Sequence, residues 1–537
     1  MSLSGDNGFS IRYSNTNVTD DLIKSTTIYL DNGVERRTES EVTESSDDEA
    51  QAYSSTSTTI LISGGKVDST VNTSGGTTTT TNTITNNIGN TILHQTITEN
   101  KTTATIYNQD EDEISYSYDL NGNITAVYNN GTQIASYVYD GFEQLTREND
   151  KLSNKTVVYK YDNAGNILSS TEYDYSDSNL REIKDNKSYG YSSSGWKDLL
   201  ETYDGQTITY DAIGNPLQYR NGIHLTWTNG RMLANYQSDI YNVSYKYNYN
   251  GLRTSKSVYD ASNGTTLETK YYYDENQLIK ESSGSDILWY LYDSNGLLVG
   301  FVLNGTSYYY EKNIQGDIIK IYNETGNEEV AYTYDAWGET TSISGNQSLG
   351  IINPFRYRGY YYDQETGFYY LQSRYYDNEI KRFINADNYN VLGIDRSSVS
   401  QDNLYTYCSN NPVNYSDPSG ELNFQWILKH ARSQRFVAGA INIVITLILD
   451  KGVSGIKTAI TQKIKNYGEK KAKIWFSEKL RNKLIAKYLG AKIANKLITS
   501  STIIWSFVTI YLDPGLAIFI AIDKMDKKPN NGYWEFW

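Results

Sequence analysis

The sequence has few of the residues that cross-link chains or bind metals. Its 537 residues include one cysteine, six prolines and three histidines. Because Cys408 is the only cysteine, an intrachain disulfide is excluded, and we interpret this residue as a small core side chain rather than a nucleophile. Three histidines, His94, His224 and His430, do not indicate a metal site. We therefore expect no metal and no cofactor.

Long apolar runs are also missing. The first ten residues, MSLSGDNGFS, lack the basic and apolar segments of a signal peptide, so no such peptide is visible. Uncharged runs at 436–449 and 497–512 hold 14 and 16 residues, fewer than the ~20 that a membrane-spanning helix needs. Neither run predicts a transmembrane segment on its own.

Tyrosine, in contrast, is abundant, with 51 copies beside 40 glycines. Many aromatic residues and few prolines favour strands joined by glycine turns, so we predict a mainly β fold. The chain is also longer than one hydrophobic core usually serves, which predicts two or three domains.

The charge is divided unevenly along the chain. Residues 423–537 hold 19 Lys plus Arg and 7 Asp plus Glu, a net charge of +12, which leaves −27 for residues 1–422. An acidic body thus carries a basic tail. We expect the tail to be attracted to the body or, once free, to an anionic membrane or nucleic acid. Simple solvation of two unrelated domains is the alternative.

A tyrosine–aspartate motif recurs between residues 110 and 352. Clear copies are SYSYDLNGNITAVY (115–128), VYKYDNAGNILSS (158–170), TITYDAIGNPLQY (207–219) and YTYDAWGETTS (332–342). Each copy predicts a β-hairpin, because Asp accepts hydrogen bonds from its own turn and Gly adopts a positive φ. The recurring aspartates are therefore predicted to be structural. Hairpin units of this kind stack into one continuous sheet.

Residues 1–109 are polar and lack this motif. The threonine tract GGTTTTTNTIT (75–85) and similar alternating segments predict strands joined by glycine turns. The acidic run EVTESSDDEA (41–50) predicts an exposed loop.

The YDxxGN spacing resembles the repeats of the Rhs family of polymorphic toxins, which includes the C components of Tc toxins and wall-associated Gram-positive toxins. NPFRYRGYYYDQETGFYYLQSRYYDNEIKRFINADNYNVLG (353–393) and NLYTYCSNNPVNYSDPSG (403–420) resemble the Rhs-associated core. The resemblance covers residues 110 to about 420. It implies a spiral β shell of YD repeats (110–352), closed by the core (353–421), around a variable C-terminal effector (422–537). The periodicity of that effector, described below, predicts that it is all-α.

In the Rhs family the core is an intramolecular aspartyl protease that cuts just beyond a DPxG turn. The resemblance implies Asp387 and Asp417 as the catalytic pair, with Arg382 as a supporting charge. Two carboxyls that share a site do not both ionise, so one polarises the carbonyl while the other activates water. We predict cleavage between Glu421 and Leu422.

The core also departs from the family pattern. Asn388 and Glu421 stand where relatives often carry Pro and Leu, and Ala386 replaces an Arg that often precedes the first aspartate. Asp395 and Asp402 lie between the two proposed catalytic residues and are alternative acids. A second interpretation is that the aspartates only cap turns in an inert plug.

The tail after residue 421 has a different periodicity. Apolar residues at three- and four-residue spacing, with lysines between them, predict a basic amphipathic helix pair over 456–497. Residues 497–522 form an apolar segment broken by Asp-Pro-Gly, which predicts a hairpin able to enter a bilayer. The membrane-inserting candidates are Trp505, Phe507, Pro514 and Phe519.

The predicted function is therefore a secreted or cell-surface bacterial toxin, released from its shell by self-cleavage, that permeabilises an anionic membrane. The partners that this implies are an immunity protein and a secretion or shell partner. A nuclease-like effector that acts on nucleic acid is the main alternative. An inert helical partner module and a non-cleaving surface or structural protein are further alternatives.

Overall fold

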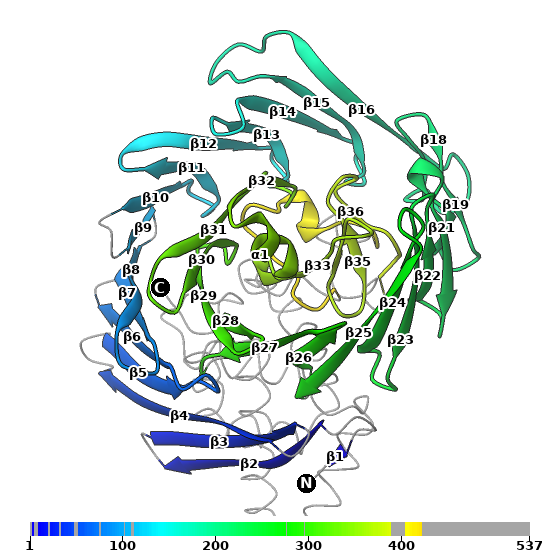
Figure 1. Cartoon of the computed structure of the whole chain (residues 1–537). Coiled ribbons are helices and arrows are strands. Elements are labelled where there is room, and N and C mark those ends of the chain that lie inside the picture. Colours follow the sequence, from blue (N-terminus) through cyan, green and yellow to red (C-terminus); the bar gives the residue numbers. More distant parts are fainter. Residues whose placement is uncertain are drawn as a thin grey trace, which may run out of the picture. The chain divides into compact units, whose positions relative to one another are not determined.

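The computed structural model of the chain describes residues 3–4, 9–19, 22–31, 34–47, 52–74, 77–100, 102–108, 112–274, 276–294, 296–387 and 403–420. Apart from 415–417, these residues belong to one compact unit. The unit is mainly antiparallel β, as the sequence predicts, and Figure 1 shows successive strands lying side by side along a curved path. The predicted helical effector lies outside the described residues.

The first sheet is a long meander. In it β1 pairs with β2, and each later strand pairs with the next one along the chain in antiparallel register. Its strands are β1 (Leu3–Ser4), β2 (Phe9–Thr19), β3 (Leu22–Asp31), β4 (Val34–Asp47), β5 (Ala52–Ile60), β6 (Lys66–Ser74), β7 (Thr77–Thr85), β8 (Thr91–Glu99), β9 (Thr103–Asn108), β10 (Glu113–Tyr118), β11 (Ile124–Asn129), β12 (Thr132–Tyr139), β13 (Leu145–Asp150), β14 (Lys155–Tyr161), β15 (Ile167–Asp174), β16 (Ile183–Tyr191), β17 (Leu200–Tyr203) and β18 (Gln206–Thr207).

The second sheet continues the same pattern of neighbouring hairpins. Its strands are β19 (Thr209–Tyr210), β20 (Pro216–Gln218), β21 (His224–Thr228), β22 (Met232–Gln237), β23 (Tyr241–Tyr247), β24 (Arg253–Asp260), β25 (Thr265–Asp274), β26 (Gln277–Ser283), β27 (Asp286–Tyr292), β28 (Leu298–Leu303), β29 (Thr306–Lys312), β30 (Ile318–Asn323), β31 (Glu328–Tyr334) and β32 (Thr340–Gly345).

The core segment after β32 begins with a short helix and then forms a small sheet. Helix α1 (Gln347–Ile352) is capped by the Asn346 side chain, which accepts from the Leu349 N–H. The third sheet contains β33 (Tyr361–Asp363), β34 (Phe368–Tyr370), β35 (Tyr375–Asp377) and β36 (Arg382–Phe383), and the core segment also has 3₁₀ turns at Tyr357–Gly359 and Cys408–Asn410. A further 3₁₀ turn, Arg220–Gly222, lies between β20 and β21 of the second sheet.

The repeat aspartates form the turns, as predicted. The Asp162 carboxylate accepts hydrogen bonds from the backbone N–H groups of Ala164 and Asn166 at 2.8 and 2.9 Å, and from the Asn166 side chain at 3.0 Å. Gly165 has φ 77°, a value that an L side chain rarely adopts. The same arrangement recurs at Asp211, which confirms a structural role for these aspartates.

In several repeats the tyrosine at the end of the strand before the turn joins neighbouring hairpins. Tyr161 donates from its hydroxyl to the Leu145 carbonyl, which lies directly after the preceding turn. Equivalent bonds run from Tyr139 to Ile124, Tyr191 to Ile167, Tyr292 to Leu278 and Tyr334 to Ile318. A buried phenol needs a hydrogen-bond partner, so each bond satisfies the tyrosine and a neighbouring backbone carbonyl together.

The two long sheets pack on each other through a shared apolar core. Side chains from β3 and β6–β8 contact side chains from β26–β30 in this core, and Tyr29 lies 6.4 Å from Trp289 between ring centroids. Lys280 forms an ion pair with Asp31 at 2.5 Å at the same interface. The polar N-terminal strands thus contribute to the same core as the YD repeats.

The expectation of a loop at the acidic run 41–50 is wrong for residues 41–47. These residues belong to β4, which pairs with β3 on one side and β5 on the other. Backbone hydrogen bonds on both sides favour a strand. Glu41, which is half exposed, forms an ion pair with Lys24 of β3 at 2.8 Å.

Glu148 of β13 is an acid buried in the fold. Its carboxylate accepts from the Ala336 N–H at 2.7 Å and from the Tyr159 hydroxyl at 3.1 Å. Burial, together with the neighbouring Asp335 carboxylate, raises the pKa of Glu148 to about 8. Because the folded state binds this proton more tightly than the unfolded state, stability decreases as the pH rises from about 4.5 towards 8.

Replacing Glu148 with Gln is therefore expected to stabilise the fold at neutral pH. The amide retains an acceptor for Ala336 and never ionises, so the free energy of unfolding should rise by on the order of 2 kcal/mol at pH 7. The gain should largely disappear below about pH 4, where Glu148 is mostly protonated in both states. Denaturant unfolding at the two pH values measures this difference, and an equal effect at both would contradict a buried, protonated Glu148.

Candidate active site

The segment 403–414 runs along the turns of the hairpins and contacts them one by one. The Asn410 amide donates to the Gln144 side chain at 2.8 Å and to the Gly165 carbonyl at 2.7 Å. The other contacts are Asn403 with Asn166 at 2.7 Å, Tyr405 with the Gly214 carbonyl at 2.7 Å, Asn411 with Asn123 at 3.2 Å and Asn414 with the Ile124 N–H at 2.7 Å. Its many asparagines thus serve to satisfy turn groups of several different repeats.

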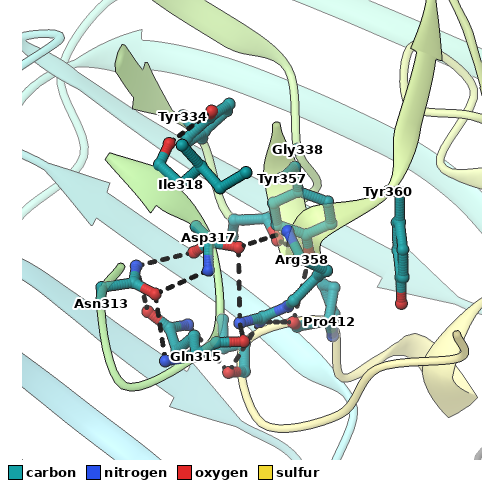
Figure 2. Close-up of polar contacts among 12 residues, drawn as sticks. Asn313, Gln315, Asp317, Ile318, Tyr334, Gly338, Tyr357, Arg358, Tyr360 and Pro412 are labelled. Carbon is teal, nitrogen blue, oxygen red and sulfur yellow. Dashed lines mark hydrogen bonds and ion pairs between the residues drawn. The ribbon is translucent and has the colours of Figure 1, made fainter. Parts of the chain in front are cut away.

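An arginine fixes the proline end of this segment. Figure 2 shows Arg358 between the 313–317 turn and Pro412. Its guanidinium donates to the Pro412 carbonyl, to the Val413 carbonyl at 3.0 Å and to the Gln315 carbonyl at 2.8 Å. The Asp317 carboxylate accepts from the backbone N–H of Arg358 at 2.8 Å. Arg358 therefore connects segment 403–414 with the turn at 313–317.

Removing one of these asparagine contacts should loosen the segment. Asn410→Ala leaves two buried acceptors, on Gln144 and Gly165, without this donor, and Asn410 itself has φ 61°. We expect a loss of about 1–3 kcal/mol in the free energy of unfolding. In the matched control, Asn263→Ala at an exposed turn, the change should stay within about 0.5–1 kcal/mol. Equal losses in denaturant melts would contradict the anchoring role.

The turn between β34 and β35 carries a buried arginine that contacts both a candidate catalytic acid and the end of the DPSG turn. Arg374, which is 5% exposed, forms an ion pair with Asp387 at 2.9 Å. The same guanidinium donates to the Gly420 carbonyl and, at 3.0 Å, to the Leu404 carbonyl. Its charged carbon lies 3.5 Å from the centre of the Phe383 ring. We call Arg374, Asp387 and Gly420 the Arg374 site.

The backbone around the Arg374 site is held on both sides. Asp387 donates its backbone N–H to the Leu404 carbonyl at 2.9 Å. The Ser419 carbonyl accepts from the Ser373 backbone at 3.2 Å and from the Ser373 hydroxyl at 2.7 Å. Gly420 has φ 69°, and a Cβ there would lie 2.9 Å from the Leu371 carbonyl oxygen, so only glycine fits without a shift.

The other candidate residues lie in different surroundings. The guanidinium of Arg382, in β36, donates to Tyr191 at 2.5 Å and to Asn166 at 3.2 Å. These are repeat side chains, whereas the charge that contacts Asp387 belongs to Arg374. Asp417 is 2% exposed and belongs to the second unit of the chain. Glu421, Leu422, Asp395, Asp402, Trp505, Phe507, Pro514 and Phe519 lie outside the described residues.

Sequence reasoning did not find Arg374. It is 13 residues before Asp387, in LQSRYYD, and no spacing rule connects the two positions. They meet because β35 and β36 form an antiparallel pair. Arg374 lies just before β35 and Asp387 lies shortly after β36, so the pairing brings the two residues to the same end of the hairpin. The only available signal was an arginine placed within the core motif.

Comparison with known proteins identifies the family. Residues 66–413, well over half of the chain, match the family described as Teneurin YD-shell. The chain belongs to this family. The resemblance of its repeats to the Rhs and YD-repeat proteins is thereby confirmed.

Curated relatives share part of this YD-shell chain. The tRNA3(Ser)-specific nuclease WapA of Bacillus spizizenii is 31% identical over 301 residues, which cover 55% of this chain and 12% of that protein. The double-stranded DNA deaminase toxin A of Burkholderia cenocepacia is 26% identical over 331 residues, 53% of this chain and 22% of that protein. The chain thus spans less than a quarter of the length of either relative.

A solved structure supports the YD-shell fold. The crystal structure of TcdB2-TccC3-Cdc42 matches with a TM-score of 0.50 at 15% sequence identity, and the match covers 77% of this chain and 27% of that chain. At this identity the match concerns the fold alone. Within the part of the chain that the structure describes, helices long and apolar enough to span a membrane are absent.

Proposed function

We propose that this chain is a YD-shell toxin that cleaves its own backbone just beyond the 417–420 turn and separates the basic residues 422–537 from the β body. The observation that carries the proposal is the Arg374 site, where one guanidinium contacts the Asp387 carboxylate and the Gly420 carbonyl. A carboxylate can act as a general base and a cation can stabilise charge on the peptide carbonyl, and both effects accelerate amide hydrolysis.

The proposed chemistry uses two carboxyl groups and water. Asp387 accepts a proton from the attacking water, whose oxygen forms the new bond to the peptide carbon. The C–N bond then breaks, and Asp417 donates the proton that the leaving amine takes up. Asp417 is assigned from its place in the YSDPSG motif, with Asp395 and Asp402 as the alternative acids. The step needs neither a metal nor a cofactor.

The released segment is proposed to act on an anionic membrane. What supports this is its net charge of +12 and the apolar segment 497–522 within it. The proposed setting is secreted or cell-surface, with an immunity protein in the producing cell and a further shell or secretion partner. The names of the relatives favour a second candidate, an effector that acts on nucleic acid, because one is a tRNA nuclease and another a DNA deaminase.

Dye release and nucleic-acid degradation, measured side by side, separate the two effectors. Purified full-length chain is added to dye-loaded vesicles of anionic and of zwitterionic lipid, and in parallel to tRNA and double-stranded DNA. Membrane action predicts leakage from the anionic vesicles and much less leakage when the salt concentration is raised. Degraded or deaminated nucleic acid without leakage would replace the membrane assignment with the second candidate.

A further inference from the structure

The residues Cys408–Asn410 form one turn of left-handed backbone. Their φ angles are 50°, 53° and 61°, and among the residues that the structure describes this is the one run of three consecutive non-glycine residues with a positive φ. A left-handed conformation brings the Cβ atom too close to the following carbonyl oxygen, so each of these residues costs free energy. Asparagine tolerates the conformation better than cysteine or serine does. The turn is therefore strained.

Contacts within the segment and with the hairpins hold this turn in place. The Asn410 N–H donates to the Tyr407 carbonyl at 3.0 Å. The Asn411 N–H donates to the Cys408 carbonyl at 2.9 Å, which closes the turn. The Asn410 amide binds two hairpin turns, and Cys408 is 3% exposed. Because strained backbone persists where the surrounding structure determines it, we expect the turn to relax once segment 403–414 leaves the hairpins.

Segment 403–414 is joined to the rest of the fold mainly through side chains. In the described part of the chain, its backbone forms two hydrogen bonds with the backbone of other segments, from Phe383 to Tyr405 at 3.0 Å and from Asp387 to Leu404 at 2.9 Å. The other contacts use side chains, such as the segment's asparagines and the Arg358 guanidinium on Pro412 (Figure 2). A strand inside either long sheet is instead bonded along its backbone to a neighbour on each side.

We propose that segment 403–414 opens as a unit, leaving the hairpin turns while the two long sheets stay folded. Two features favour this opening over the loss of a strand. The strain at residues 408–410 is relieved when the segment leaves, and few backbone hydrogen bonds have to break. Folded proteins open locally in cooperative units of this kind, and lids are drawn from their less stable parts.

This inference goes beyond the proposed function and does not depend on it. Segment 403–414 precedes the 417–420 turn in the chain, so it stays with the β body whether or not the backbone is cleaved. Its opening would uncover turn groups in both long sheets, such as those of Asn123 and Gly214. The YD shell would thereby gain an edge that opens without separation of its strands.

Amide hydrogen exchange of the full-length chain, read by mass spectrometry with fragmentation, measures this opening. One reporter is the Ile124 N–H, which donates to the Asn414 side chain at 2.7 Å, and the other is the Phe383 N–H. After correction for intrinsic rates, both should exchange with the same opening constant and at least roughly tenfold faster than the amides of the β13–β14 pair. Equal protection of the reporters and the strand amides would overturn the inference, because the segment would then leave only on global unfolding.

The variant Ser409→Gly tests the contribution of the strain. Among the described residues the Ser409 hydroxyl has no hydrogen-bond partner, so the change removes little besides the Cβ atom. Glycine adopts a positive φ without steric cost. We therefore expect the two reporters to exchange roughly 3–10-fold more slowly than in the wild type. Unchanged or faster exchange would overturn the role given to the strain.

The variant Ser193→Gly is the matched control. Ser193 is exposed in the loop between β16 and β17, and its φ is not positive. Glycine there relieves no strain and only adds freedom to the unfolded chain. The reporters should keep their wild-type exchange rates in this variant. Equal slowing in the two variants would show a general effect of glycine and would also contradict the inference.

Discussion

Asp387→Asn is expected to leave the chain uncleaved. Asn has the same shape, and the backbone N–H of residue 387 still donates to Leu404. The variant loses the ion pair with Arg374, so a denaturant melt must first show that it is folded. The amide cannot accept the water proton, and loss of a general base slows such reactions by about 10²–10⁴-fold. A time course of intact mass should therefore show the full-length chain where the wild type shows two fragments.

Two further variants sharpen this result. Asp417→Asn should block cleavage as strongly, because the leaving amine loses its proton donor. Asp260→Asn, at an exposed turn, should cleave at the wild-type rate. If Asp387→Asn cleaved at the wild-type rate, Asp387 would not be the general base. Loss of cleavage in Asp395→Asn or Asp402→Asn, with Asp417→Asn active, would move the second acid there.

Asp363→Asn should cause the largest loss of stability among single changes in the core. The Asp363 carboxylate is fully buried and accepts from Arg253 at 2.5 Å and from Lys256 at 2.9 Å. An amide in its place leaves Arg253 without its carboxylate partner and leaves Lys256 paired with Glu365 alone. Breaking a buried ion pair from one side costs about 3–5 kcal/mol. Denaturant unfolding of the wild type and the variant at pH 7 measures this loss.

The same variant has a characteristic pH dependence. Burial by itself raises the pKa of Asp363, but Arg253 and Lys256 outweigh burial and hold it below its ordinary value. A lowered pKa stabilises the fold above the pKa of the unfolded state, about 3.9, and this contribution is lost as the pH falls through the folded value. The difference between wild type and Asp363→Asn should therefore shrink below about pH 4.

An exposed ion pair provides the control for this prediction. Asp174 pairs with Lys184 at 3.3 Å, and both side chains are more than one-third exposed. Because solvent screens such pairs, Asp174→Asn should change the free energy of unfolding by less than about 1 kcal/mol. Similar losses in Asp363→Asn and Asp174→Asn would contradict a special role for the buried cluster.

The sequence predicted the parts of the fold that depend on local chemistry. The turn at Asp162 follows from its side chain bonding to its own backbone, and Gly165 supplies the positive φ. The bond from Tyr161 to Leu145 was not predicted, because it joins two hairpins and depends on their stacking. Local rules therefore gave each hairpin but did not give the contacts between hairpins.

The candidate site shows the same division. Asp387 was predicted from a motif, whereas Arg374 was not predicted, because its contacts with Asp387 and Gly420 arise from tertiary structure. The acidic run was predicted as a loop because charge was weighed without the pairing of β4 to both of its neighbours. In both cases the sequence did not show which strands lie beside one another.

The most direct test of the account is the mass of the freshly folded wild-type chain over time. Self-cleavage predicts that the full-length species converts, at a rate independent of protein concentration, into two masses that sum to the chain plus one water. The bond that breaks should be one of the two peptide bonds of residue 421. A single full-length mass that persists, in protein whose β structure is intact, would contradict the account.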